Sequence, residues 1–320
     1  MDKQKFSFTS ADTLPIKLFL DEHALACIKK RHILPIHVQL NPTNKCNQNC
    51  TFCSCGLRDK NKEIPFERAT SIIEIFYHLE TKAITITGGG EPTLYRDLGK
   101  LIDFIYRKGI KIGLVTNGLQ LDSIADKVEK LTWCRISFSD QQKAERYLLN
   151  KLLHFKKKYP KVDWGLSYVI TRYFDKKNLS ELINFTDKNK LSHIRIVSDL
   201  LDLDNVPDIS SWLSNFNDSY GRIIYQRRKD YKPGRNPCYL SLLKPNIGPD
   251  GNMYPCCGVQ YVLKKASLDF PPSMSMGDNI KNIYVKQKFF DGRRCQRCYY
   301  DQYNQIIALM MEDIKHKEFI

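Results

Sequence analysis

Three cysteines near the start of the chain have a spacing suited to an iron–sulfur cluster. Cys46, Cys50 and Cys53 are separated by three and then by two residues. Three thiolates can bind three irons of a four-iron cluster and leave the fourth iron without a protein ligand. Because that iron is open to a small molecule, the pattern predicts a cluster that takes part in chemistry and does not only transfer electrons.

A structural zinc ion is the main alternative for these thiols. Such a site normally takes four Cys or His ligands. Cys55 is the nearest further cysteine, but only Ser54 separates it from Cys53, which is a cramped spacing for two ligands of one tetrahedral ion. The sequence therefore favours the cluster over zinc.

The cysteine spacing, with the aromatic Phe52 before the last cysteine, resembles the Cys-x3-Cys-x2-Cys signature of the radical S-adenosylmethionine (SAM) enzymes. The resemblance implies that Cys46, Cys50 and Cys53 bind a [4Fe–4S] cluster, whose open iron binds the amino and carboxylate groups of SAM. It also implies that the reduced cluster cleaves SAM into methionine and a 5′-deoxyadenosyl radical, which abstracts hydrogen from a substrate. An electron donor such as flavodoxin or ferredoxin is the implied partner.

A glycine-rich motif follows the next expected strand. Gly89, Gly90, Glu91 and Pro92 match the Gly-Gly-Glu-Pro motif of the same family. Glycines let a ligand approach the backbone, and a carboxylate suits the ammonium group of SAM. We therefore expect these four residues to bind the cofactor, with a simple turn before a capped helix as the alternative.

Weaker similarities lie at the ends of the third and fourth expected strands. Asn117 belongs to a Thr-Asn-Gly sequence that is common in the family. Ser137 and Ser139 lie where related enzymes place polar groups near the ribose of SAM. The spacing departs from the usual Ser-x-Asp by one residue. The sequence therefore does not decide which of Ser137, Ser139 and Asp140 contacts the ribose. Capping of the next helix by Ser139 and Asp140 is an equal alternative.

A second set of cysteines occupies the C-terminal part of the chain and resembles the twitch domain, the shorter relative of the SPASM extension of radical SAM enzymes. The cysteines that carry the resemblance are Cys238, Cys256, Cys295 and Cys298. The resemblance implies that they bind one auxiliary [4Fe–4S] cluster, with Cys257 as an alternative to Cys256. A four-cysteine zinc ribbon is the competing interpretation, although the set has only one Cys-x2-Cys pair.

Strand-like and helical patterns alternate between these motifs. Strands are expected at 36–41, 83–87, 111–116, 134–139, 164–170 and 193–197, and helices at 66–80, 95–107, 119–129, 141–159 and 178–188. This alternation predicts parallel βα units. With the resemblance, it implies an α/β fold: a partial (β/α)6 TIM-like barrel followed by a small α+β twitch domain. Ligands are expected at the carboxyl ends of the strands.

The expected domain limits follow from these patterns. An N-terminal extension, 1–35, contains a helical stretch at 13–33, and the radical SAM barrel covers 36–200. A connecting segment, 201–236, leads to the twitch domain and C-terminal helix at 237–320. Within this last part, a hairpin is expected at 245–254, because its Asp-Gly pair suits a tight turn, and a helix at 303–315.

Composition narrows the class of protein. The 320 residues include 50 Lys and Arg against 35 Asp and Glu, which gives a net charge of +15. Eleven cysteines, with neither a secretory signal nor an apolar stretch long enough to span a membrane, predict a cytoplasmic protein whose thiols hold metal. The positive charge indicates either a lysine-rich surface or an anionic partner.

The motifs do not specify the substrate. A peptide is the first choice, because peptide modification is common among radical SAM enzymes with such extensions, although no N-terminal segment is large enough for a separate leader-peptide-binding domain. A nucleotide, a sugar, a nucleic acid or another small anion is the alternative that the charge suits. The competing class is a zinc-stabilised RNA-binding module without catalysis, which leaves the glycine-rich motif unexplained. No membrane partner is expected.

Overall fold

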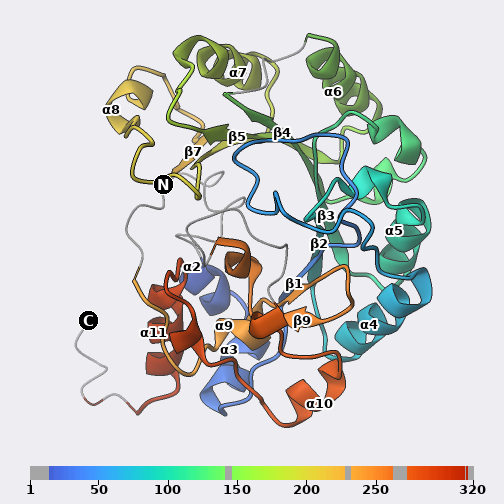
Figure 1. The fold of residues 1–320 in the computed structure, drawn as a ribbon, viewed down its shortest axis with the longest axis vertical. Helices are drawn as coiled ribbons and strands as arrows, with labels where there is room; N and C mark the ends of the chain where they lie inside the picture. Colours follow the sequence, from blue (N-terminus) through green and yellow to red (C-terminus); the bar gives the residue numbers. More distant parts are fainter. Residues whose placement is uncertain (1–13, 141–145, 228–231, 262–271, 314, 316–320) are drawn as a thin grey trace.

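One curved sheet organises the molecule (Figure 1). The computed structural model describes residues 14–140, 146–227, 232–261, 272–313 and 315. The strand order is β7-β6-β5-β4-β3-β2-β1-β8-β9, and all neighbours pair in parallel except β8 and β9. The strands are β1 His37–Leu40, β2 Ala83–Ile86, β3 Lys111–Thr116, β4 Trp133–Ser139, β5 Asp163–Ile170, β6 His193–Ser198, β7 Ile223–Gln226, β8 Asn246–Ile247 and β9 Met253–Tyr254.

Four helices cover the outer face of the sheet (Figure 1). They are α4 Phe66–His78, α5 Leu98–Arg107, α6 Arg146–Lys158 and α7 Lys176–Lys188. The buried residues of α5 are Leu98, Leu101, Ile102 and Ile105. This i, i+3, i+4, i+7 spacing places them on one face of the helix, which packs on the sheet.

The strands bury alternate residues beneath these helices. In β5, Trp164, Leu166, Tyr168 and Ile170 are fully buried. Because successive side chains of a strand point to opposite faces, the residues between them face the concave side of the sheet. The hydrophobic core thus lies between the sheet and the helices. The concave side of the sheet carries the alternate side chains, which are not part of this core.

The C-terminal part packs against the β1 edge. Its helices are α9 Leu240–Leu243, α10 Ile280–Val285 and α11 Asp301–Met310, and α8 Ser210–Leu213 lies farther along the sheet near β7. Strand β8 pairs with β1, α10 contacts α4, and α11 contacts the N-terminal helices α2 Leu14–Phe19 and α3 Glu22–Lys29. Within the described ranges, no helix is both long and apolar enough to cross a membrane.

The structure confirms the α/β fold with a mostly parallel open sheet, and the hairpin expected at 245–254 is present as β8 and β9. Two expectations about the sheet were incomplete. The segment 201–236, expected as a connection, contributes strand β7, and β8 continues the barrel sheet beyond β1. The parallel sheet is therefore wider than the six predicted strands.

Several expected helices differ, among them the one expected at 303–315, which the structure has at Asp301–Met310. The stretch 119–129 contains two 3₁₀ turns, Leu121–Ile124 and Val128–Lys130. Leu121, Ile124 and Val128 are buried all the same, because helical periodicity reports a buried face and not the hydrogen-bond pattern. The stretch 13–33 forms two helices because Asp21 accepts a hydrogen bond from the Ala24 backbone and caps the second. The helix expected at 141–159 is described from Arg146 onward, and 141–145 lie outside the described residues.

Candidate functional site

The predicted cofactor residues meet in one cavity of about 310 Å³ at the carboxyl ends of the parallel strands. We call it the cofactor cavity. Nine of the residues singled out in the sequence line it: Cys46, Cys50, Cys53, Gly89, Gly90, Glu91, Pro92, Asn117 and Ser137. They come from the loops after β1, β2 and β3 and from β4. Motifs that follow successive strands in the sequence thus lie side by side at the carboxyl ends of the sheet.

Two of the three polar groups considered at the end of β4 do not line this cavity. Ser139 is fully buried, and its backbone oxygen accepts a hydrogen bond from Asn178 Nδ2 at 3.2 Å. The Asp140 carboxylate accepts hydrogen bonds from the Tyr168 hydroxyl at 2.7 Å and from the Asp175 backbone at 3.1 Å. Of the three, only Ser137 faces the cofactor cavity, with its Oγ 3.0 Å from Ser167 Oγ.

Arg58 holds the loop that carries the three cysteines, and sequence reasoning missed it. Its buried guanidinium donates from Nε to Asn44 O at 2.9 Å and from Nη1 to Cys55 O at 2.7 Å. Nη1 also lies 3.4 Å from Cys53 Sγ. The only signal in the sequence is a basic residue five positions after the last cysteine, which is too common a feature to point to this role.

The three thiols have different environments. A hydrogen bond with Cys55 lowers the pKa of Cys53 to about 6, and the positive charge of Arg58 acts in the same direction. Burial raises the pKa of Cys50 to about 11, and the neighbouring Cys53 and Cys46 add to the rise. Three thiolates this close therefore need a cationic partner in order to ionise together. An iron–sulfur cluster would supply that partner, so the donor set fits the predicted group.

The spacing of the thiols also bears on the zinc alternative. Among the residues that the structure describes, no three His, Cys, Asp or Glu side chains are placed to hold one metal ion. In a four-iron cluster each thiolate binds a different iron, so the sulfurs stand farther apart than around a single ion. The absence of a single-ion arrangement from the described residues is compatible with a cluster, which does not require the thiols to converge on one point.

Glu91 joins the loop after β2 to the end of β3. Its Oε1 accepts hydrogen bonds from Thr93 N at 3.0 Å, from Thr93 Oγ1 at 2.7 Å and from Thr116 Oγ1 at 2.5 Å. Its Oε2 accepts one bond, from Asn117 N at 2.7 Å. Asn117 Nδ2 in turn donates to Asn47 Oδ1 at 2.7 Å, within the cysteine loop. This carboxylate, expected to face an ammonium group, is thus also part of the framework that positions the loop.

Gly90 is required by the protein's own backbone. A Cβ at this position would lie 2.1 Å from Lys45 O, far inside van der Waals contact. The adjoining backbone donates from Gly90 N to Thr43 O at 3.1 Å and from Glu91 N to Lys45 O at 2.7 Å. The glycine therefore lets two loops pack together, a reason that differs from the expected approach of a ligand.

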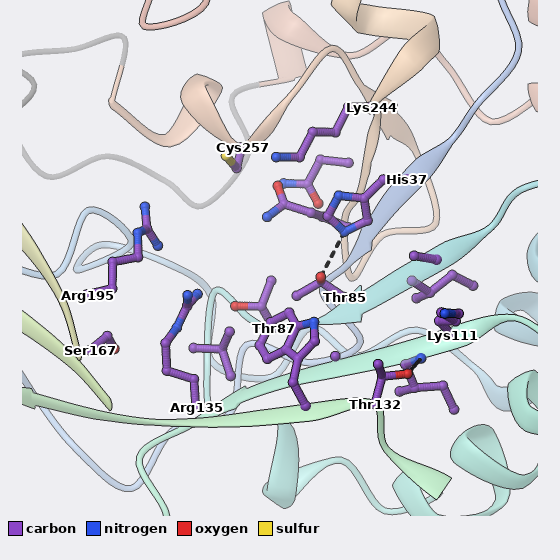
Figure 2. A pocket seen from close by; sticks show the side chains of 18 of the residues that line it. His37, Thr85, Thr87, Lys111, Thr132, Arg135, Ser167, Arg195, Lys244 and Cys257 are labelled. Atoms are coloured by element: carbon purple, nitrogen blue, oxygen red, sulfur yellow. Dashed lines mark hydrogen bonds between the residues drawn. The ribbon is translucent and has the colours of Figure 1, made fainter. Parts of the chain in front are cut away.

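A second, larger cavity of about 490 Å³ lies on the concave side of the sheet (Figure 2). We call it the barrel cavity. It shares five lining residues with the cofactor cavity: Thr87, Gly88, Val115, Arg195 and Val197. The two cavities are therefore neighbours with a common wall, and a molecule in one lies next to a molecule in the other.

The four C-terminal cysteines predicted to act together line a third, small cavity: Cys238, Cys256, Cys295 and Cys298. Backbone hydrogen bonds hold their segments together, from Cys238 N to Phe290 O at 2.9 Å and from Cys298 N to Lys232 O at 2.7 Å. Burial raises the pKa of Cys238 and of Cys295 to about 12, and nearby thiols add to both rises. This buried thiol set also needs a cationic partner in order to ionise, so its chemistry fits a metal cluster.

Cys256 and Cys257, which the sequence left as alternatives, face different cavities. Cys256 lines the small cavity with the other three cysteines. Cys257 lines the barrel cavity, and its Sγ is 3.6 Å from the Tyr300 hydroxyl. The geometry thus groups Cys256, and not Cys257, with the C-terminal set.

Comparison with known proteins places this site in a wider context. A family model described as the Radical SAM superfamily matches residues 40–176. A probable GTP 3′,8-cyclase of Sulfolobus acidocaldarius is 27% identical over 173 residues, 50% of this chain and 55% of that protein. One from Thermoplasma volcanium is 35% identical over 112 residues, 34% of this chain and 33% of that protein. The chain thus spans about half or less of the length of these two relatives.

Solved structures of similar fold cover more of the chain. Streptococcus suis SuiB bound to S-adenosylmethionine has a TM-score of 0.63 and 17% identity, covering 87% of this chain and 72% of that one. anSMEcpe with bound AdoMet and the Kp18Cys peptide has a TM-score of 0.56 and 16% identity, covering 89% and 86%. At this identity the likeness shows the fold alone.

Proposed function

We propose that this chain, which carries a radical SAM domain in residues 40–176, is an enzyme that cleaves SAM reductively and abstracts hydrogen from a substrate. The supporting observation is that Cys46, Cys50, Cys53 and the glycine-rich segment 88–92 line one cavity, which shares a wall with the barrel cavity. When bound there, a [4Fe–4S] cluster and SAM would supply a 5′-deoxyadenosyl radical.

The chain's own residues have distinct tasks in this proposal. Arg58 fixes the cysteine loop and favours the thiolate of Cys53. Glu91 and Asn117 tie that loop to the ends of β2 and β3. Ser137 would offer its hydroxyl to a polar group of the cofactor, and a substrate in the barrel cavity would lie on the other side of the shared wall. Orientation of two ligands across a common wall is the main contribution that these residues make.

The auxiliary [4Fe–4S] cluster is part of the same proposal. Cys238, Cys256, Cys295 and Cys298 come from separate segments and line one cavity, which supports a single shared group. Four thiolates would complete the coordination of that cluster, so it has no open iron for SAM. Its task would be electron transfer, with a flavodoxin or ferredoxin as the external donor, or stabilisation of the C-terminal part.

The comparisons offer two substrate classes. A peptide, the first choice from the sequence, is bound in two similar structures, SuiB with its precursor peptide SuiA and anSMEcpe with the Kp18Cys peptide. GTP 3′,8-cyclase is the name of several curated relatives. The bound peptides and the GTP of the name belong to those proteins. The chemistry of the barrel cavity is the better guide to the substrate of this chain.

Anaerobic reconstitution tests the proposed function. The full chain is reconstituted with iron and sulfide, analysed for metal and absorbance, and incubated with SAM and dithionite. We expect a brown protein that forms 5′-deoxyadenosine. Cys50→Ala should abolish the product, whereas Cys27→Ala, a cysteine of α3 that lines neither the cofactor cavity nor the small C-terminal cavity, should not. A colourless protein with stoichiometric zinc would contradict the proposal.

A further inference from the structure

We propose that the barrel cavity binds a small phosphorylated molecule. The proposal rests on the proposed function, in which this molecule is the substrate of the radical chemistry. Its volume of about 490 Å³ lies within the range of roughly 300–1,000 Å³ that is usual for small-molecule sites. Within the described parts of the chain, neither Asp nor Glu lines it. The basic residues of its lining are Lys17, Lys82, Lys111, Arg135, Arg195 and Lys244, of which Lys82 forms an ion pair with Asp21 at 2.5 Å. The cavity is therefore strongly cationic.

Three of these cations point into the cavity from different walls (Figure 2). Arg135 comes from β4, Arg195 from β6, and Lys244 follows α9 on the opposite side. Gln226 Oε1 accepts a hydrogen bond from Arg195 Nε at 2.8 Å, which orients that guanidinium. Guanidinium groups match the geometry of phosphate oxygens with two parallel hydrogen bonds, and lysine adds a point charge. This combination suits a ligand with more than one negative charge.

Two histidines report the same positive environment. Burial lowers the pKa of His37 to about 3, and the charges of Lys244 and Lys17 lower it further. Burial also holds the pKa of His193 well below its usual value, with Arg135 and Arg195 adding to the effect. Both imidazoles are therefore neutral at pH 7. They leave the positive charge of the cavity unchanged.

Polar groups for the remainder of the ligand lie on β1, directly after it, and on β8. Asn41 and Asn246 are fully buried and line the cavity, and neither side-chain amide has a hydrogen-bond partner among the residues that the structure describes. Gln39 Oε1, beside Asn246 in the paired strands, is also without a partner. Buried amides without partners are costly in a folded protein. A bound molecule with donors and acceptors beyond its phosphate groups would satisfy them.

The position of Arg195 connects this anion site with the radical chemistry. Arg195 lines both the barrel cavity and the cofactor cavity. A phosphorylated molecule held by Arg135, Arg195 and Lys244 would thus lie beside the place proposed for SAM. These three side chains bring positive charge into a cavity whose described lining has no carboxylate, so we favour the phosphorylated molecule over a peptide without phosphate groups.

Equilibrium dialysis with tripolyphosphate tests the inference on the anaerobically reconstituted full chain. We expect one binding site, at least about tenfold weaker in each of Arg135→Gln, Arg195→Gln and Lys244→Gln, because a hydrogen bond to a charged group is lost. The matched control, Arg107→Gln, removes an exposed arginine at the end of α5 and should change the affinity less than about twofold. GTP should compete for the site, and guanosine should compete at least about tenfold more weakly.

Two further measurements keep the test valid if a cavity variant folds poorly. Tripolyphosphate should raise the melting temperature of the unmodified chain and of Arg107→Gln, and Arg135→Lys should show an intermediate loss of affinity. Absence of tripolyphosphate binding, or binding that the three cavity variants leave unchanged, overturns the inference. Tighter binding of a hexaglutamate peptide at the same site also overturns it, in favour of a peptide substrate.

The two proposals fail in different ways. Cleavage of SAM by a chain that does not bind tripolyphosphate would remove the inference and leave the proposed function intact. Tripolyphosphate binding by a reconstituted chain that does not cleave SAM would remove the proposed function and leave the anion site. Cys50→Ala should keep the anion site, because Cys50 does not line the barrel cavity.

Discussion

Replacement of Glu91 by Gln separates two roles of this carboxylate. One role is the framework that the structure contains, in which two oxygens accept four hydrogen bonds from Thr93, Thr116 and Asn117. The other is the contact with the ammonium group of SAM that the family resemblance implies. Gln has nearly the same shape but only one acceptor oxygen, so the framework loses at least one bond whichever way the amide is turned.

The smallest loss can be worked from the contacts. If the amide oxygen replaces Oε1, the bonds from Thr93 and Thr116 survive, and the amide nitrogen then faces the Asn117 backbone N–H. This ends one charge-assisted hydrogen bond and sets two donors against each other, at a cost of about 1.5–3 kcal/mol in the free energy of unfolding. At roughly 2–4 °C per kcal/mol, the melting temperature should fall by about 3–12 °C.

The assay compares Glu91→Gln with Glu129→Gln, which makes the same chemical change at an exposed position. Thermal melting of the reduced, cluster-free chains gives the framework contribution. Dialysis of SAM against the reconstituted chains gives the contribution to cofactor binding. We expect a lower melting temperature and weaker SAM binding in Glu91→Gln, with both clusters still assembled. Equal melting temperatures in the two variants, combined with lost SAM affinity, would refute the framework argument and leave the ammonium contact alone.

Three further predictions concern the clusters and the charge. The reconstituted chain should hold about eight irons. Cys256→Ser should lower this number to about four, and Cys257→Ser should not. Equal iron counts in the two variants would show that the small cavity is misassigned. Cys50→Ala should abolish 5′-deoxyadenosine, whereas Cys298→Ala, if circular dichroism shows it folded, should retain some SAM cleavage; the opposite pattern would reverse the two cluster assignments. Tripolyphosphate binding should weaken as salt screens the cationic cavity, and salt-independent affinity would mean that charge does not direct recognition.

The sequence predicted those parts of the fold that depend on local pattern. The bounds of β3, Lys111–Thr116, were predicted without error, because Ile112, Leu114 and Val115 form a short apolar run and Gly109 and Gly118 lie just outside its ends. Strand β7 was missed because it has only four residues, and only Ile224 among its apolar side chains is fully buried. A short edge strand carries too little hydrophobic pattern to stand out from a loop.

The candidate site divides in a similar way. The cysteines and the glycine-rich motif were predictable because their types and spacing in the chain carry the chemistry. The cationic barrel cavity was not, although Arg135 and Arg195 stand at inward positions of β4 and β6, because it exists only once the sheet curves and brings separate strands together. Arg58 was missed because its role depends on the path of the loop, which the sequence does not reveal.

The pairing of β8 with β1 has a consequence for the modularity of the chain. Backbone donors of Ile36, Gln39 and Asn41 bond to the carbonyls of Leu243, Pro245 and Ile247 at 2.9–3.0 Å. A chain cut before Cys238 would leave these donors on a bare sheet edge, which is a template for pairing with other molecules. The barrel cavity would also lose the wall that carries Lys244 and Asn246. The C-terminal segment is therefore not a detachable accessory, and a barrel expressed alone should aggregate.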